Sequence, residues 1–401
     1  MKGVFVQCRG FCPLLLLAAV LASPATQAQP RIQAARPGVW SRLPRAEVQT
    51  VRVLGDYAYL VDGYGGLEVI DASVPANPVL AGNYFNGDWL SGFELVGTNM
   101  AAVLVNFGMA ILDLSNPASP QMIGQLTNND HIIYEFQVVG SYAFAAGYYG
   151  LQIVDLSSPT NPVVVGSWED LPTSYAQAVR VQVAGHIAYV TVDTDPGSTG
   201  GILQAVIDVS DPANPVFLKY LDTIHSYLNE IREAGHYLLA VDFKPFLNVY
   251  DNSDPTNSAL VASFPTRSST FGLTIVGNYA YVPEPDVGAV QVFDISNPTN
   301  VIEVALFDAH GRCESLSVAN NLVYVANWDQ GLTIIPSAPY LQFTVEIDAT
   351  PGVPFTIESA TDLGLPQPWS PLVTTNSNRM PFWFTDRDVA AGSKFYRVRQ
   401  P

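Results

Sequence analysis

The sequence predicts an all-β fold of seven repeated, four-stranded units followed by a small separate β module. A short apolar run ending in an aspartate recurs along the chain, and each copy follows two alternating apolar segments that meet at a glycine. Helical periodicity is hard to find after the first 28 residues. Because a period of ~40 to 45 residues made of short strands is typical of propeller blades, the predicted architecture is a seven-bladed β-propeller.

The period is marked by the last residue of each apolar run. The runs read LEVID, AILD, LQIVD, AVID, NVYD, QVFD and a divergent LTIIP. Their last residues are Asp71, Asp113, Asp155, Asp208, Asp251, Asp294 and Pro336, which are 42, 42, 53, 43, 43 and 42 residues apart. An aspartate before a Ser-x-Pro turn can accept hydrogen bonds from the N–H groups of that turn. We therefore interpret the six aspartates as structural and not as catalytic acids.

Each unit divides into four strands. Segments such as VRVLGDYAYLV and FQVVGSYAFAA supply the first two strands, which are joined at a residue able to adopt positive φ. These turn residues are Gly55, Gly97, Gly140, Gly185, Gly235 and Gly277, with Asn320 in the seventh unit. The marker run is the third strand, and a segment such as PVLAGNYF after the proline-rich turn is the fourth.

The two ends of the ring are predicted to join. The seventh unit stops after its third strand, whereas PGVWSR, residues 37–42, resembles a fourth strand that lacks its three predecessors. We expect this strand, within the N-terminal segment 29–45, to complete the last blade of a propeller spanning 46–338. Closure of this kind removes the open sheet edges that favour aggregation.

The first 28 residues have the pattern of a signal peptide. Lys2 and Arg9 precede the apolar run PLLLLAAVLA, and small residues lead to a plausible cleavage point after Ala28. The run is short for a permanent anchor, and no later segment is long enough to span a bilayer. We expect an exported protein that is periplasmic, on the cell surface or secreted. Cys313 is then the one cysteine left, so no disulfide is expected.

Composition and charge exclude some partners. Only 13% of residues are charged and the net charge is −18, which becomes −20 when the signal peptide removes Lys2 and Arg9. Such a charge repels nucleic acids and anionic membrane surfaces. Residues 339–401 lose the repeat and alternate in segments such as PFTIESATDL and KFYRVRQP, which predicts a small C-terminal β-sandwich-like module.

The repeated runs LEVID, LQIVD, AVIDV and VQVFD, each followed by S-x-P-x-N-P or a close variant, resemble the LVIVD-repeat family. The resemblance extends from Glu47 to about Ser337, with an insertion in the fourth unit and Pro336 at the seventh marker. It implies an exported bacterial or archaeal β-propeller of the surface or interaction type. The family implies a fold more firmly than a function.

Loops that are not repeated are the place to look for a binding site. Propeller topology puts the loops between second and third strands on the same face as the loops between blades. Aromatic residues are frequent there, with carboxylates nearby, and could bind a glycan, a peptide or an envelope protein. The candidates are Tyr64, Trp89, Phe107, Tyr149, Trp168, Tyr175, Tyr227, Phe243 and Trp328. The alternative is that several of these rings fill the ends of the blades.

A metal site is a weaker alternative. His131, His225 and His310 fall near the starts of innermost strands, and Asp193 and Asp195 share one loop that could bind Ca²⁺. The same residues can equally be solvated loop positions. We predict no cofactor, with Ca²⁺ as the alternative.

Three functions are open at this point. A non-catalytic binding propeller is favoured, because the innermost strands carry a mixture of charged and neutral side chains, Arg52, Glu94, Glu135, Arg180, Glu230 and Arg232 among the charged ones. The alternatives are a hydrolase or lyase with a site at the channel mouth and an envelope scaffold. No oligomeric state follows from the sequence.

Overall fold

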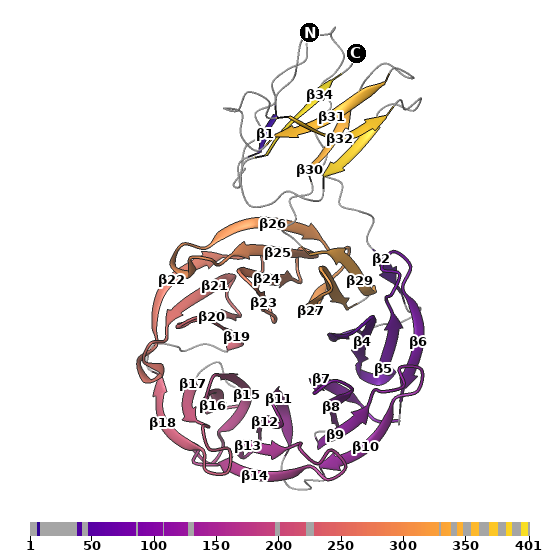
Figure 1. The fold of residues 1–401 in the computed structure, drawn as a ribbon. Coiled ribbons are helices and arrows are strands. Elements are labelled where there is room, and N and C mark those ends of the chain that lie inside the picture. Colours follow the sequence, from indigo (N-terminus) through magenta and orange to yellow (C-terminus); the bar gives the residue numbers. More distant parts are fainter. Residues whose placement is uncertain are drawn as a thin grey trace. The chain divides into compact units, whose positions relative to one another are not determined.

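The computed structural model describes residues 6–8, 38–41, 47–85, 87–106, 108–126, 132–196, 201–221, 228–328, 330–337, 343–347, 354–360, 369–375, 382–386 and 394–399. The chain divides into two compact units, one formed by Ala35–Pro336 and the other by Met1–Ala34 with Ser337–Pro401. The larger unit is a seven-bladed β-propeller whose blades are four-stranded antiparallel sheets arranged in a ring (Figure 1). The predicted fold class is confirmed.

The blades follow the chain in order, and within each blade the strands run from the centre of the ring to its rim (Figure 1). Blades 1 to 3 are β3 (Thr50–Leu54), β4 (Tyr57–Asp62), β5 (Gly66–Asp71) and β6 (Val79–Tyr84); β7 (Leu90–Val96), β8 (Met100–Val105), β9 (Gly108–Asp113) and β10 (Gln121–Leu126); β11 (Ile133–Val139), β12 (Tyr142–Gly147), β13 (Gly150–Asp155) and β14 (Val163–Trp168). Blades 4 to 6 are β15 (Gln177–Ala184), β16 (Ile187–Asp193), β17 (Ile202–Asp208) and β18 (Val216–Leu221); β19 (Leu228–Ala234), β20 (Tyr237–Asp242), β21 (Phe246–Asp251) and β22 (Ala259–Pro265); β23 (Thr274–Val276), β24 (Tyr279–Glu284), β25 (Ala289–Asp294) and β26 (Ile302–Asp308). Blade 7 is β27 (Cys313–Ala319), β28 (Leu322–Asn327), β29 (Gly331–Pro336) and β2 (Gly38–Trp40).

The N-terminal strand closes the ring, as predicted. Val39 of β2 pairs with Thr333 of β29, so the two ends of the propeller share one sheet. An apolar cluster shared by blades 1 and 7 contains Leu60 of blade 1 and Tyr324 of blade 7.

The core is a series of apolar layers between neighbouring blades. The second and third strands are buried on both faces because a blade covers each side, as for Val61 and Leu67. Tyr59 of β4, for example, stacks on Phe93 of β7 with ring centroids 5.9 Å apart. Burying such a side chain stabilises the fold by ~1.5–3 kcal/mol. Each blade therefore depends on its two neighbours to bury both faces of its second and third strands.

The turns between third and outer strands fasten each blade to the one before it. Each of the six marker aspartates accepts a hydrogen bond through Oδ1 from the N–H of the serine two residues on, at 2.8–2.9 Å. Hydrogen bonds from the hydroxyl and the N–H of the same serines hold the pKa values of Asp71, Asp113, Asp208 and Asp251 below the ordinary range. The turn then lies against the outer strand of the preceding blade. A Cβ on Gly124 of β10 would be only 2.0 Å from the carbonyl oxygen of Pro159 in the next turn.

The second unit is built of β strands too. One sheet has the order β1 (Val6–Cys8), β34 (Lys394–Arg399), β31 (Phe355–Ala360) and β32 (Ser370–Thr375), and β30 (Phe343–Ile347) pairs with β33 (Phe382–Asp386). Of the predicted signal peptide, only Val6–Cys8 is described, and cleavage remains a prediction. No helix among the described residues is long and apolar enough to cross a membrane.

Candidate binding face and central channel

Antiparallel pairing sorts the connections of the propeller onto two faces. In each blade the loop between the second and third strands lies at the same end of the sheet as the link from the preceding blade. We call this end the loop face. The opposite end carries the glycine turns and the aspartate-serine turns, and we call it the hairpin face. The non-repeated residues of the chain therefore gather on the loop face.

Several acidic residues of the loop face hold its loops in place. The carboxylate of Asp62 accepts a hydrogen bond from the N–H of Glu47 at 3.3 Å, and that of Asp242 accepts one from the N–H of Lys244 at 2.7 Å. Both carboxylate side chains are buried. They end the second strands of blades 1 and 5 and anchor the backbone beside them.

In blades 6 and 7 the last residue of the second strand, Glu284 or Asn327, likewise anchors the backbone beside it. Glu284 is fully buried, and its Oε2 accepts hydrogen bonds from Ser268 N and Oγ at 2.6 and 2.8 Å. Burial raises the pKa of Glu284, although the bonds from Ser268 oppose this. In blade 7, Asn327 donates to the carbonyl of Ala309 at 2.9 Å. The burial of these acidic and amide groups was not predicted from the sequence.

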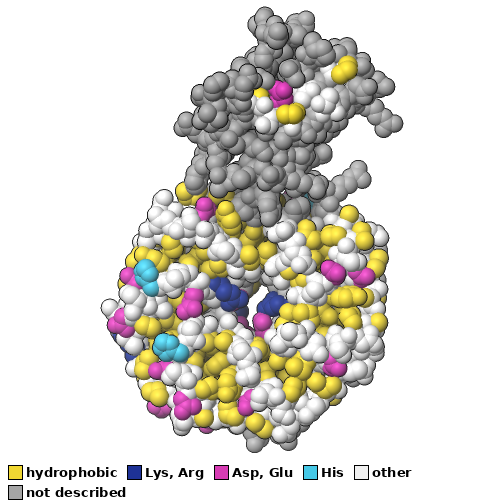
Figure 2. All heavy atoms as spheres, in the orientation of Figure 1, with side chains coloured by type: hydrophobic (Ala, Val, Ile, Leu, Met, Phe, Trp, Pro, Cys, Tyr) yellow, Lys and Arg dark blue, Asp and Glu magenta, His cyan; other side chains and the backbone are white. Residues whose placement is uncertain are grey.

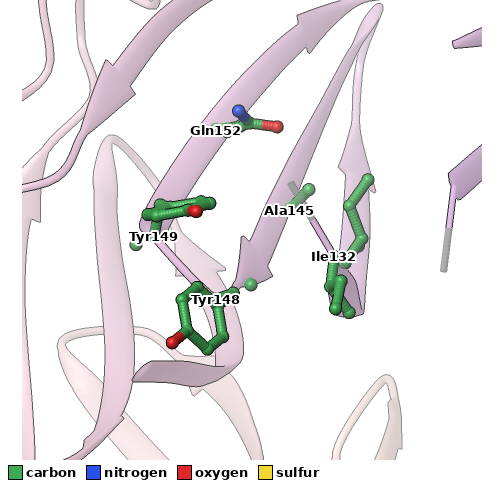
Figure 3. A pocket seen from close by; sticks show the side chains of 8 residues that line it. Ile132, Ala145, Tyr148, Tyr149 and Gln152 are labelled. Carbon is green, nitrogen blue, oxygen red and sulfur yellow. The ribbon is translucent and has the colours of Figure 1, made fainter. Parts of the chain in front are cut away.

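A tyrosine pair is exposed on blade 3. Tyr148 and Tyr149 are 40% and 44% exposed, and their rings meet edge to face with centroids 4.9 Å apart. They line a small hollow with Ile132, Ala145 and Gln152 (Figure 3). Tyr175, in the link to blade 4, is 76% exposed.

A second aromatic group lies on blades 5 and 6. Phe243 is 49% exposed, and its ring meets that of Phe271 edge to face at 5.7 Å. Phe246, at the start of β21, is also exposed. Phe271 and Phe246 were not predicted; phenylalanine within otherwise polar loops was the available signal.

The three tryptophans predicted to bind a partner lie in different environments. Trp168 is buried and stacks on Phe217 of the next blade, with ring centroids 5.6 Å apart. Its ring belongs to the core, so its placement among the binding residues is corrected. Trp89 packs its ring against Gly63, and the guanidinium of Arg312 lies 5.7 Å from the ring centre of Trp328. Both are half-buried.

Some predicted site residues cannot be placed. Phe107, Tyr227, His131 and His225 lie outside the described residues, and of Tyr64 the structure describes the backbone only.

The remaining candidate metal ligands are not brought together. Asp193 is buried and accepts a hydrogen bond from the N–H of Asp195 at 3.1 Å. Nδ1 of His310 lies 3.1 Å from Oδ1 of Asp308. Across the described ranges, no group of three or more His, Cys, Asp or Glu side chains is placed to hold a metal ion.

Paired charges line the central channel. Arg52 of blade 1 bonds to Glu94 of blade 2, with Nη2 and Oε1 2.5 Å apart. Arg180 Nη1 lies 4.0 Å from Glu135 Oε1. Glu135 also accepts hydrogen bonds from Val181 N at 3.1 Å and from the amide of Gln182 at 3.3 Å. Figure 2 shows basic side chains at the opening of the ring with acidic ones beside them, and further acidic side chains over the blades.

Two carboxylates of the channel, Glu135 and Glu230, have raised pKa values. Burial raises the pKa of Glu135 to about 8, although Arg180 opposes this shift. Burial also raises the pKa of Glu230, which is opposed by its ion pair with Arg232 on the same strand. Water still reaches between 19% and 32% of each charged side chain. The carboxylates are thus engaged by groups of the protein itself.

Comparisons with known proteins agree with this architecture. A model of the LVIVD repeat matches residues 46–86, 102–128, 135–170, 176–223, 269–309 and 310–346, more than half of the chain. Blade 5 is not matched, although its sheet is regular. No curated protein matches.

Solved structures support the fold alone. The β-propeller domain of Cps50 (Swd1) from Myceliophteria thermophila is 11% identical with a TM-score of 0.57, covering 76% of this chain and 100% of that one. The WD40 β-propeller domain of Doa1 is 8% identical with a TM-score of 0.57, covering 76% and 98%. The designed Ika8 protein is 10% identical with a TM-score of 0.51, covering 72% and 83%.

Proposed function

The chain belongs to the LVIVD-repeat family of β-propellers, and we propose that it is an exported, non-catalytic protein that binds a glycan, a peptide or another surface protein through its loop face. The observation that carries this proposal is the exposure of aromatic rings on that face, where Tyr148, Tyr149, Tyr175 and Phe243 are 40%, 44%, 76% and 49% exposed. Rigid aromatic side chains are enriched where proteins bind partners, because they bury a large area at a small entropic cost.

The central channel favours binding over catalysis. A general acid or base must reach the proton that it transfers. The carboxylates of Glu94 and Glu135 are instead held by Arg52, Val181 and Gln182 of neighbouring blades. We therefore prefer a binding module to a hydrolase or lyase at the channel mouth.

The proposal is tested with the purified protein on a glycan array and in a pull-down from solubilised cell envelopes. The variant Tyr149→Ala with Phe243→Ala truncates two exposed rings of the loop face. Its matched control, Val139→Ala with Val276→Ala, truncates two side chains that are 38% and 43% exposed on the hairpin face.

We expect saturable retention of a partner that the loop-face variant loses and the control keeps. Equal retention by both variants would contradict a loop-face site. No retention by either route would overturn the binding function and favour an envelope scaffold.

A further inference from the structure

We propose that the central channel binds a small monocarboxylate through the guanidinium groups of Arg180 on β15 and Arg232 on β19, the innermost strands of blades 4 and 5. Water reaches this place, because 28% of the Arg180 side chain and 32% of the Arg232 side chain are exposed. The site is separate from the aromatic residues of the loop face. It therefore goes beyond the proposed function and has a test of its own.

The guanidinium of Arg180 has few acceptors. A guanidinium carries five N–H donors. Among the described residues, that of Arg180 makes one hydrogen bond, from Nη1 to the carbonyl oxygen of Asn229 at 3.5 Å. Oε1 of Glu135 is 4.0 Å from Nη1, whereas a normal N–H···O bond spans roughly 2.7–3.2 Å. Glu135 accepts its hydrogen bonds from Val181 and Gln182 instead, so it leaves Arg180 with donors to spare.

Arg232 brings a second guanidinium to the same place. Its Nη1 donates to Oε1 of Gln182 on β15 at 3.0 Å and to the carbonyl oxygen of Ile231 at 2.9 Å, and it also pairs with Glu230. All these contacts involve Nη1, so Nε and Nη2 have no acceptor within the part of the chain that the structure describes. Arg180 of β15 reaches β19, and Arg232 of β19 reaches β15, so both guanidinium groups lie between these two strands.

Charges from several blades act together in the channel. Burial raises the pKa of Glu230, and the neighbouring Arg232 opposes this shift. Arg52 of blade 1 and Arg180 of blade 4 also lower this pKa, whereas Glu94 of blade 2 raises it. Groups on four blades therefore lie near enough to act on one carboxylate. They are equally placed to act on the charge of a small ligand.

The spare donors suit a carboxylate. A planar guanidinium binds a carboxylate through two parallel N–H···O bonds. The channel has three arginines paired with three glutamates. Burial raises the pKa of Glu135 to about 8, so this carboxyl group is mostly protonated at neutral pH. One positive charge is then left without a counter-charge, and a ligand with a single negative charge would neutralise it.

The groups of the channel itself decide the affinity. The chain carries a net charge of −18, but at physiological salt the repulsion between exposed charges is screened beyond about 8 Å. The strands packed against β11, which carries Glu135, bring Glu94 from β7 and Arg180 from β15. The other two, β8 and β12, bring no carboxylate or basic side chain. Ionisation of Glu135 should therefore weaken the binding of an anion.

The test follows the binding of isotope-labelled acetate to the whole protein by the broadening of its NMR signal. Acetamide, which has nearly the same shape and no charge, is the neutral counterpart, and chloride is added as a competitor. Arg180→Gln removes one guanidinium. Arg267→Gln is the matched control, because Arg267 pairs with Glu303 of the outer strand β26 at 2.6 Å, outside the channel. Circular dichroism establishes that each variant is folded.

We expect Arg180→Gln to weaken acetate binding by roughly 10- to 100-fold, the effect of losing a hydrogen bond to a charged group. Arg267→Gln should bind acetate like the wild type. In the wild type, the affinity should fall by up to roughly 10-fold between about pH 7 and pH 9, as Glu135 ionises.

Equal affinity of the two variants for acetate would overturn the inference, and so would the absence of acetate binding. Displacement of acetate by acetamide would overturn it too, because the site would then not depend on charge. Displacement by an equal concentration of chloride would show a general anion site and would overturn the carboxylate assignment. Each of these results would leave the proposed loop-face function as it is.

Discussion

Replacing Gly124 with alanine should destabilise the propeller by a clash between blades 2 and 3. The new Cβ would lie 2.0 Å from the carbonyl oxygen of Pro159 and 3.0 Å from its carbonyl carbon. Because these are backbone atoms, no rotation of a side chain relieves the overlap. Inserting a methyl group where there is no space costs ~1–3 kcal/mol, and this outweighs the ~0.4–1 kcal/mol that glycine-to-alanine changes gain at compatible positions.

The neighbouring strand offers a matched control. Gly108 in β9 belongs to the same blade, and its Cβ would meet nothing nearer than the carbonyl oxygen of Leu126 at 3.4 Å. We expect Gly108→Ala to be neutral or slightly stabilising. Urea unfolding followed by tryptophan fluorescence gives both changes in unfolding free energy from the shift in midpoint. If Gly124→Ala is as stable as Gly108→Ala, the turn does not fasten one blade to the next.

Three further predictions concern the channel, the turns and the core. The pKa of Glu135 in the folded protein, about 8, lies above its ordinary value of 4.5. Its stabilising contribution to the free energy of unfolding is therefore complete below pH ~4.5 and is lost as the pH rises through 8. Glu135→Gln should therefore flatten the fall in unfolding free energy between pH 5 and pH 9, and an unchanged profile in urea unfolding would count against this. Asp155→Ala should lower the urea midpoint more than Asp155→Asn, whose amide oxygen can still accept the bond from Ser157 N; equal midpoints would argue against the turn role. Trp168→Ala should cost ~3–5 kcal/mol and Tyr175→Ala at most ~0.5 kcal/mol in the same assay, and the reverse order would contradict the core position of Trp168.

The fold could be predicted because its causes are repeated along the chain. Each blade shows the same alternating strands, the same turn with positive φ and the same aspartate-serine turn. Even Asn320, which replaces glycine in blade 7, has a φ of 53°. The closing strand was predictable because Gly38–Trp40 copies the outer-strand pattern of the other blades.

The site was less predictable because its geometry depends on neighbouring blades. Trp168 ends β14 and Tyr175 lies in the link that follows, but Phe217 of blade 4 stacks on Trp168, whereas Tyr175 is exposed. The burial of Glu284 likewise depends on Ser268, which lies in the preceding link. No local pattern distinguishes an exposed loop residue from one that the next blade covers.

The proposed binding face is tested most directly by photo-crosslinking. A benzophenone amino acid is placed at position 175, the most exposed aromatic position among the described residues of the loop face, or at position 276 on the hairpin face, and each protein is irradiated in solubilised cell envelopes. The account predicts a discrete crosslinked partner from position 175 and none from position 276. A partner captured only from position 276 would contradict it.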